Sequence, residues 1–426
     1  MPIEIRQGTL VHRLYVLIPW LIAIGAIVYV PFATKFGFTP GSIDKPLRIN
    51  QINQVIAYAV AILGLDLVIG YSGQLSLGQS AFIGTGAYTT VILVADHDWG
   101  YLATLPASAA ICFVAGLLVG IPAIRVRGVY LAIVTLVIAF IFPSIVLHFD
   151  WLTGGTNGKG PPRTGARLRA PSWLPYSDTG RLADPLWVYT ISIVVAAALF
   201  VLARNFVRSR PGRALVAVRD NEAGAVSMGV TLGPYKALAF GVSAMYGGIA
   251  GSLLMFIRPF ASEVQFGWRL AIFLVVGLVI GGTGTISGAP IGAFVYLFIP
   301  FYMSQWTYDQ SGMPPGLRQV TAPLFDLLRP GGSAADGIVF GLVVILAMFV
   351  LPGGFIDGVR RLRGRIVRVV PDPAWLRERR REHRGEEHHE TLFHPTGQHV
   401  HVERHSTATT ATTEPTEETG ATTAER

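Results

Sequence analysis

Apolar residues run along this chain in blocks that have the length of a membrane-spanning helix. LYVLIPWLIAIGAIVYVPF and LWVYTISIVVAAALFVLA are two examples, and an α-helix needs about 20 residues to cross roughly 30 Å of hydrocarbon. We therefore predict an all-α polytopic integral membrane protein with about ten segments, some of them broken or re-entrant helices. The expected segments are 14–32, 49–69, 75–94, 101–121, 128–148, 186–203, 237–257, 268–281, 288–304 and 337–351.

The composition supports the same class of protein. Hydrophobic residues make up 51% of the 426 positions and charged residues only 14%, against about 25% charged in soluble globular proteins. So few charges cannot cover a surface that faces water. A closed β-barrel is disfavoured, because barrel strands alternate apolar and polar residues over about 10 positions. The single cysteine, Cys112, lies within an apolar run and cannot form an intrachain disulfide.

The basic residues orient the predicted segments, because cytoplasmic loops are enriched in lysine and arginine. Basic groups precede the first segment, lie between the fourth and fifth and between the sixth and seventh, and follow the last. All four groups share one side if the number of segments is even, so we expect both termini to be cytoplasmic. Orientation then accounts for the net charge of +8, although basic residues in the loops 33–48 and 150–185 disagree with it.

Two parts of the chain differ in composition. We expect a transmembrane domain over 1–365, with a long polar loop at 204–236, and a hydrophilic cytoplasmic tail over 366–426. The tail contains the charge run RERRREHRGEEHHE and seven of the ten histidines. Histidine-rich tracts can bind metal, but this spacing matches no defined site, so no metal ligand is assigned. The tail has few residues that pack, and it is predicted to be disordered.

Two glycine-rich interruptions share one pattern. Residues 70–76 (GYSGQLS) and 281–287 (GGTGTIS) both read G-x-[ST]-G-x-[LI]-S, and each follows an apolar segment. A backbone group freed from a helix in lipid costs several kcal/mol unless protein or water satisfies it, and glycine permits positive φ. Many transporters build a solute path from such breaks near the middle of the bilayer. The candidate path residues are Gly70, Tyr71, Ser72, Gly73, Gln74, Ser76, Gly281, Thr283, Gly284 and Ser287.

The breaks also permit simpler interpretations. Glycines 78, 84 and 86 are typical of close helix packing through small residues, and the same explanation is available for the breaks themselves. The shared pattern leaves open whether the chain contains a duplicated unit of two helices and a break.

Polar side chains near the breaks have two candidate roles. Ser72, Gln74, Ser76 and Thr283 can bond freed backbone groups or face a solute. Asp66 lies four residues before the first break. An ionisable residue inside a span indicates a functional site, and it is included in the candidate path. The alternative is that Asp66 lies near the cytoplasmic interface, solvated or bonded to a helix end.

The loop at 204–236 combines apolar and charged positions. Pro211 and Gly212 predict a turn. From 213 to 228, apolar positions alternate with charged ones, which predicts one or two short amphipathic helices broken before Gly229. Such a helix can lie on the bilayer surface or dock into a groove of a soluble partner.

Six segments between residues 50 and 300 follow one another in a recognisable order. They are GYSGQLSLGQSAFIGTGAY, RGVYLAIVTL, LTGGTNGKG, RPGRALVAVRDNEAGAVSMGV, YKALAFGVSAMYGGIAG and GGTGTISGAPIGA. In these segments the chain resembles the permease subunits of branched-chain amino acid ABC importers, the LivM-like group. The residues beyond about 365 lie outside the resemblance.

The resemblance implies that the loop at 204–236 is the coupling segment that engages an ATPase subunit. Two departures affect its helical register: Gly224 replaces an alanine of the usual Glu-Ala-Ala pattern, and Gly229 comes one place late. Family members often carry asparagine at the position of Asp66. The implied coupling residues are Gly212, Arg213, Ala214, Arg219, Asp220, Glu222, Ala223 and Gly229.

The resemblance also implies a multi-pass subunit of the bacterial inner membrane, without a cofactor and without enzymatic activity of its own. Its expected partners are two ATP-binding ABC subunits, a second homologous or identical permease, an extracytoplasmic solute-binding protein and the lipid bilayer, with no nucleic acid. The expected solute is a branched-chain or other neutral amino acid. Urea or a short amide is the alternative.

Two other classes explain less of the sequence. An ATP-independent secondary transporter or channel accounts for the broken helices, but it gives little reason for the long polar loop. A membrane-embedded enzyme is supported only by Asp66, since the spans contain no zinc-binding spacing and no nucleophile elbow. Residues 154–160 (GGTNGKG) are one residue short of a P-loop and lack its Ser or Thr, so ATP hydrolysis is expected on a partner chain.

Overall fold

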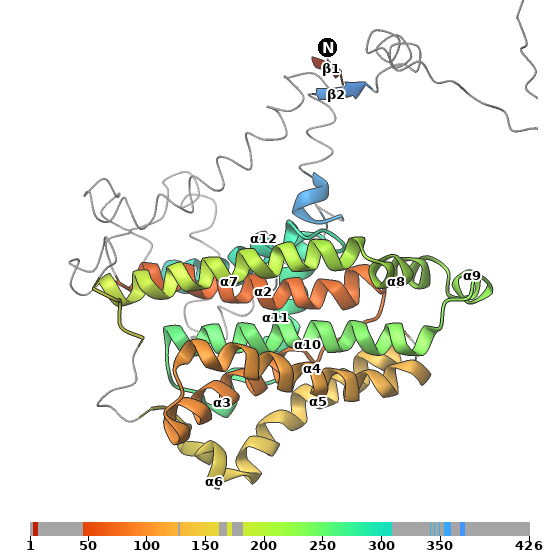
Figure 1. The fold of residues 1–426 in the computed structure, drawn as a ribbon. Coiled ribbons are helices and arrows are strands. Elements are labelled where there is room, and N and C mark those ends of the chain that lie inside the picture. Colours follow the sequence, from red (N-terminus) through yellow and green to blue (C-terminus); the bar gives the residue numbers. More distant parts are fainter. Residues whose placement is uncertain are drawn as a thin grey trace, which may run out of the picture. The chain divides into compact units, whose positions relative to one another are not determined.

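The computed structural model is built almost entirely of helices, which confirms the predicted class (Figure 1). It describes residues 3–6, 46–126, 128–161, 168–172, 182–308, 341, 345, 349, 353–358 and 367–370. The long helices are α2 (Pro46–Asp66), α3 (Gln79–His97), α4 (Tyr101–Arg125), α5 (Val129–His148), α7 (Ala183–Arg208), α10 (Leu232–Ile257), α11 (Trp268–Gly281) and α12 (Gly288–Tyr308). The shorter ones are η1 (Leu67–Tyr71), α6 (Asp150–Thr153), η2 (Gly155–Asn157), α8 (Arg210–Asp220), α9 (Glu222–Ser227) and η4 (Glu263–Phe266).

One pair of short strands accompanies the helices. β1 (Ile3–Arg6) and β2 (Val367–Val370) pair in parallel, with Ile3 opposite Val367. The compact unit that contains the helices ends at Val370. The first residues of the predicted tail therefore belong to this unit, and the rest of the tail, including its histidines, lies outside the described residues.

Six helices in the described part of the chain are long and apolar enough to cross a membrane. They are Pro46–Tyr71, Tyr101–Arg125, Val129–His148, Ala183–Arg208, Leu232–Ile257 and Glu263–Gly281. The predicted start of the third segment, at residue 75, is wrong: α3 begins only at Gln79, because Leu75 to Gly78 belong to the break. The predicted segments 14–32 and 337–351 lie outside the described residues, apart from helical residues at 341, 345 and 349.

The centre of the bundle is α10, which packs against α4 and α3 on one side and α2 on the other (Figure 1). Small residues allow close backbone contact: a Cβ on Gly86 of α3 would collide with Gly248 of α10, and one on Gly116 of α4 would collide with Ala244 of α10. The prediction of close packing at Gly86 is confirmed; Gly84 likewise faces Phe142. These contacts make α3, α4 and α10 one tightly packed block.

The hydrogen bonds between these helices, and from α3 to α2, are made by uncharged hydroxyl and amide side chains. Thr90 of α3 donates to Ser252 of α10 at 2.7 Å, and Ser252 donates to Ser108 of α4 at 2.6 Å. Gln79, the first residue of α3, donates to the carbonyls of Ala61 on α2 and Ser243 on α10, both at 3.2 Å. All these polar groups are buried, and each is paired across a helix interface, as a low-dielectric interior requires.

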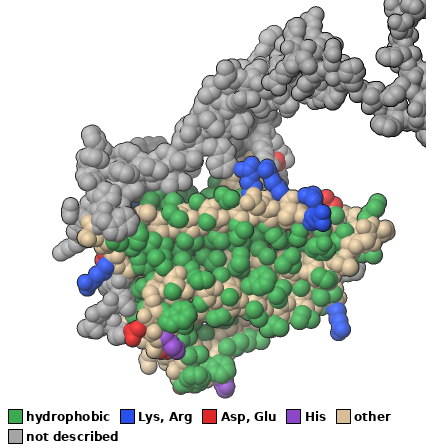
Figure 2. Space-filling model, viewed as in Figure 1, with side chains coloured by type: hydrophobic (Ala, Val, Ile, Leu, Met, Phe, Trp, Pro, Cys, Tyr) green, Lys and Arg blue, Asp and Glu red, His purple; other side chains and the backbone are tan. Residues whose placement is uncertain are grey.

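The outer surface is apolar. Figure 2 shows hydrophobic side chains over most of the described face, with Lys and Arg at its margins. On α4 and α5, large apolar residues such as Leu118 and Ile133 are more than half exposed. A surface of this kind is unfavourable in water and suits a lipid environment.

Candidate functional site

The first predicted break is present and directly follows the end of a long helix. α2 continues through the π-helical turn η1 to Tyr71, and the chain is then non-helical until α3 starts at Gln79. Gly73 has φ of +70°, a conformation that favours glycine. The break lies at the end of a 26-residue apolar helix, between the two predicted segments 49–69 and 75–94.

Side chains of the first break satisfy its freed backbone. Ser72 Oγ donates to the carbonyl of Val68 at 2.8 Å, and Gln74 Nε2 donates to Ser72 Oγ at 2.8 Å. The amide of Leu77 donates to Thr135 Oγ1 of α5 at 2.8 Å. The sequence analysis anticipated the bonding by Ser72 and Gln74 and missed Thr135, which carries no local signal because it lies 58 residues away.

The second break joins α11 to α12. Gly282 has φ of +111° and Gly284 φ of +71°. Thr285 Oγ1 donates to the carbonyl of Gly282 at 2.7 Å, whereas Thr283 is exposed. Of the two roles expected for Thr283, bonding the freed backbone is taken here by Thr285, three residues after Gly282, and facing a solute stays a prediction.

The two breaks touch each other. Asp66 Oδ1 accepts a hydrogen bond of 2.7 Å from the backbone amide of Gly284, and the Asp66 side chain is fully buried. Gly70 lies between them: a Cβ there would collide with the Asp66 carboxylate and with the Gly284 backbone. Asp66 thus accepts from the break that follows the end of α11, which matches the expected alternative of a bond to a helix end, while its burial excludes the solvated form.

The predicted coupling loop reaches the same point. Arg219 of α8 donates through Nη1 to the carbonyl of Gly70 at 2.8 Å, and a Cβ on Gly73 would lie 2.7 Å from Arg219 Cγ. We call this meeting point of two breaks and one loop helix the break junction. It comprises Asp66, Gly70, Gly73, Arg219 and Gly284.

The loop itself folds into two short helices, as predicted. Ser209 caps α8, and Asn221 caps α9 by accepting from the amide of Gly224 at 3.0 Å. Gly229, with φ of +82°, follows α9. The predicted turn at Pro211 and Gly212 is wrong: both lie in the first turn of α8, where proline needs no hydrogen bond from its nitrogen.

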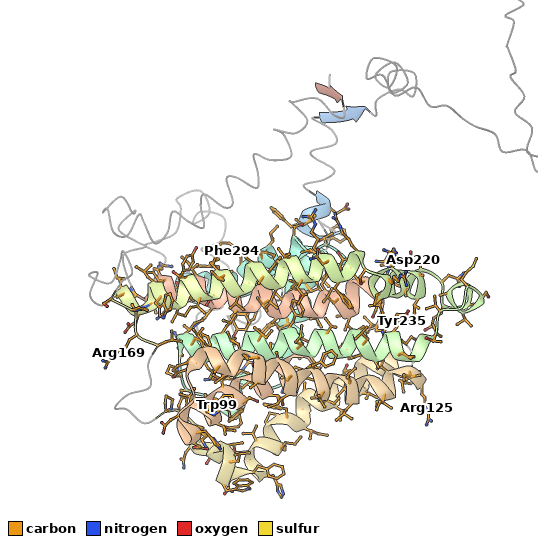
Figure 3. The ribbon with its side chains drawn as sticks, in the orientation of Figure 1. Trp99, Arg125, Arg169, Asp220, Tyr235 and Phe294 are labelled. Carbon is orange, nitrogen blue, oxygen red and sulfur yellow. The ribbon has the colours of Figure 1, made fainter. Side chains whose placement is uncertain are left out.

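An ion pair fastens α9 to the bundle. Lys236, in the second turn of α10, pairs with Glu222, the first residue of α9. Lys236 is only 4% exposed, so without Glu222 a buried ammonium group would be left without a counter-charge. Figure 3 places Tyr235 of α10 and Asp220 of α8 at the same end of the bundle. The sequence analysis used Lys236 only to assign orientation.

The two break-containing units are not structurally equivalent. α11 and α12 pack closely on each other, with Gly277 against Gly292, whereas α2 and α3 make few contacts. The first break thus separates two helices, and the second forms a tight helical hairpin. What the two breaks share is local: each has a glycine with positive φ and a hydroxyl group that donates to a nearby backbone carbonyl.

We expect Asp66→Asn to retain near-normal stability and transport, because asparagine keeps an oxygen for the Gly284 amide. Asp66→Leu should lower the free energy of unfolding by about 1–3 kcal/mol, since it leaves that amide without its acceptor. Thermal unfolding and uptake assays of both variants check this. An inactive Asn variant would show that the charge itself is required.

Together, the apolar helices, the backbone breaks satisfied by protein and the docked polar loop define a polytopic membrane protein of the transporter class. Comparison with known families narrows the class: residues 47–348 match the family described as branched-chain amino acid transport system, permease component. This match covers more than half of the chain, and the chain belongs to that family.

Individual relatives share a third or less of their aligned residues with this chain. The high-affinity branched-chain amino acid transport system permease proteins LivM of Salmonella typhimurium and Escherichia coli are 32% identical over 274 residues, which cover 61% of this chain and 63% of each relative. The ribose import permease protein RbsC of Haemophilus influenzae is 25% identical over 313 residues, 70% of this chain and 86% of the relative. No solved structure shows a significant match to the chain.

Proposed function

We propose that this chain is the permease subunit of an ABC importer that carries branched-chain amino acids into the bacterial cell. In this proposal both termini and the helices α8 and α9 are cytoplasmic. The chain pairs with a second homologous or identical permease, two ATP-binding subunits dock on α8 and α9, and an extracytoplasmic binding protein delivers the solute. The assignment of branched-chain amino acids as the solute is supported by the LivM relatives. It needs a direct test because a ribose import permease is also related to the chain.

The observation that carries the proposal is the hydrogen bond between Arg219 and the carbonyl of Gly70. It joins a helix of the coupling loop directly to a break between two apolar helices. A displacement of α8 by an ATPase would pull on the last turn of the helix, directly before the non-helical residues 72–78. The end of a helix next to a non-helical segment changes conformation at lower cost than the middle of an intact helix, which suits it to act as a gate.

Reconstitution tests this function. Proteoliposomes that contain the permeases, the ATP-binding subunits and the cognate binding protein should accumulate tritiated leucine only when ATP is enclosed with the ATPase. Omission of the ATP-binding subunits should abolish uptake. Uptake that persists without ATP would identify a secondary transporter, and accumulation of ribose or urea in place of leucine would overturn the solute assignment.

A further inference from the structure

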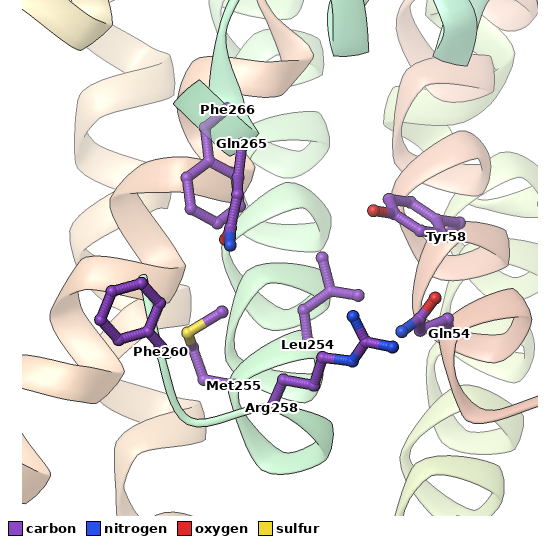
Figure 4. Close-up of a pocket in the computed structure, with 8 residues that line it drawn as sticks. All are labelled: Gln54, Tyr58, Leu254, Met255, Arg258, Phe260, Gln265 and Phe266. Atoms are coloured by element: carbon purple, nitrogen blue, oxygen red, sulfur yellow. The ribbon is translucent and has the colours of Figure 1, made fainter. Parts of the chain in front are cut away.

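A cavity of about 260 Å³ lies at the end of the bundle opposite the break junction (Figure 4). It is bounded by the middle of α2, the last turns of α10 and the segment that leads to α11. Tyr58 on its wall precedes Gly70 by twelve positions, or about 18 Å of helix. Its volume is slightly below the range of roughly 300–1,000 Å³ of drug-sized ligand sites, and it suits a small solute.

One wall of the cavity is polar. Arg258, the C-cap residue of α10, extends its guanidinium toward Gln54 of α2, and Tyr58 of α2 lies on the same side of the cavity (Figure 4). The Arg258 side chain has no ion-pair partner among the described residues. A guanidinium without a carboxylate, at the end of an apolar helix, is a site that favours an incoming anion, above all a planar carboxylate that it can bind in bidentate fashion.

The rest of the lining is mostly apolar, apart from Gln265, which lies beside Phe266 (Figure 4). Leu254 and Met255 of α10 and Phe266 of η4 contribute buried side chains, and Phe260 closes the rim with a half-exposed ring. A few directed polar groups facing an apolar wall are typical of sites for small amphiphilic ligands. The cavity therefore offers separate surfaces for a charged end and a hydrocarbon end of one molecule.

The rim is held in place by the LTGGTNGKG segment. Lys159 and Ala261 exchange two backbone hydrogen bonds of 2.9 and 2.8 Å. Lys159 Nζ also donates to Asp96 at 2.5 Å and to the carbonyl of Leu152 at 2.7 Å. Gly158 packs so closely on Phe260 that a Cβ there would lie 2.7 Å from the ring. The segment that resembles a P-loop in sequence thus positions the cavity rim.

We propose that this cavity is a solute site that binds an aliphatic α-amino acid by its carboxylate through Arg258. The amide oxygen of Gln54 accepts from the ammonium group, and the branched side chain lies against Met255 and Phe266. This inference rests on the proposed function, because it assumes that an amino acid reaches the permease. It assigns to Arg258 the discrimination between acids and their uncharged amides.

The test measures tritiated leucine binding to the purified permease–ATPase complex, without binding protein, in phosphatidylcholine nanodiscs. Arg258→Gln should weaken binding at least about tenfold, since a hydrogen-bonded charge pair is lost. The leucine affinity of Arg258→Lys should fall between those of the wild type and Arg258→Gln. Arg269→Gln is the matched control, because Arg269 is an exposed arginine at the start of the nearby α11, outside the cavity lining.

Competition identifies the chemical group that is recognised. Unlabelled 4-methylpentanoate, which keeps the carboxylate and the side chain, should displace leucine, and leucinamide should not. Stronger displacement by leucinamide, absence of leucine binding to the wild type, or equal binding by Arg258→Gln and wild type would each overturn the proposal. If the Arg258→Gln complex does not assemble, the wild-type competition profile and the Lys variant still decide the question.

Three further outcomes separate this inference from lipid binding at Arg258 and from the proposed function. If phosphatidylglycerol nanodiscs abolish leucine binding, Arg258 holds a lipid phosphate and the solute assignment is wrong. If wild-type proteoliposomes take up leucine with ATP while Arg258→Gln binds leucine normally, the cavity assignment fails and the transport function stands. If no ATP-dependent leucine uptake occurs at all, the proposed function fails.

Discussion

A Gly73→Leu variant should enter the membrane at normal levels and lose transport. Gly73 combines φ of +70° with direct packing on Arg219, so leucine would strain the backbone and displace the Arg219 side chain from the carbonyl of Gly70. The rest of the bundle does not depend on this position, and insertion should be unaffected. Membrane yield by immunoblot and ATP-dependent leucine uptake measure the two effects separately.

Gly100→Leu provides the matched control. Gly100 precedes α4 with φ of −65°, and nothing lies within 4 Å of a Cβ placed there. The same side chain is therefore added without strain or collision, and uptake should remain near the wild-type rate. Full uptake by Gly73→Leu, or an equal loss in both variants, would remove the break junction from the mechanism.

Reversal of two charges, Arg219→Glu together with Glu222→Lys, should weaken docking of the ATP-binding subunit at least about tenfold. The first change replaces a donor to the Gly70 carbonyl with a carboxylate, and the second sets two lysines against each other. Both should release α8 and α9 from the bundle, because the loss of one partner of a buried pair costs several kcal/mol. Affinity is measured by pull-down with the purified ATP-binding subunit.

A charge swap separates local geometry from simple loss of charge. Glu222→Lys alone should impair docking, and Glu222→Lys combined with Lys236→Glu should recover much of it, since the pair is rebuilt with opposite polarity. Failure of the swap to recover docking would indicate that the ATP-binding subunit contacts Glu222 itself. Unchanged affinity in the single variant would show that the α9 ion pair has no part in docking.

The sequence was sufficient for the elements whose signals are local. Apolar length located the long helices between residues 46 and 308, and alternation of apolar and charged positions located α8 and α9. Glycines with positive φ were anticipated at both breaks because few other residues adopt that conformation, and the helix end before Gly229 was anticipated as well. The two misassigned details, the start of α3 and the turn at Pro211, are boundary questions that depend on which hydrogen bonds are finally made.

The break junction could not be predicted in the same way. Asp66 and Gly284 are separated by 218 positions and Arg219 and Gly70 by 149, and no periodicity in one chain encodes such pairs. The choice of Thr285 over Thr283 depends on the direction of the chain after Gly282. The sequence analysis therefore treated the path and the coupling loop as separate features, while the structure brings residues of both into contact.

The close packing of α3, α4 and α10 has a mechanical consequence. The glycines bring the helix backbones into direct contact, with no deformable layer of long side chains between them. We therefore expect α10 to move as one rigid body together with α3 and α4. From Lys236 to Arg258 this helix spans about 33 Å. We expect a tilt imposed on α10 beside α9 to displace the guanidinium of Arg258 at the other end of the helix. The docked ATP-binding subunit and the proposed binding cavity would then be coupled through one unbroken helix.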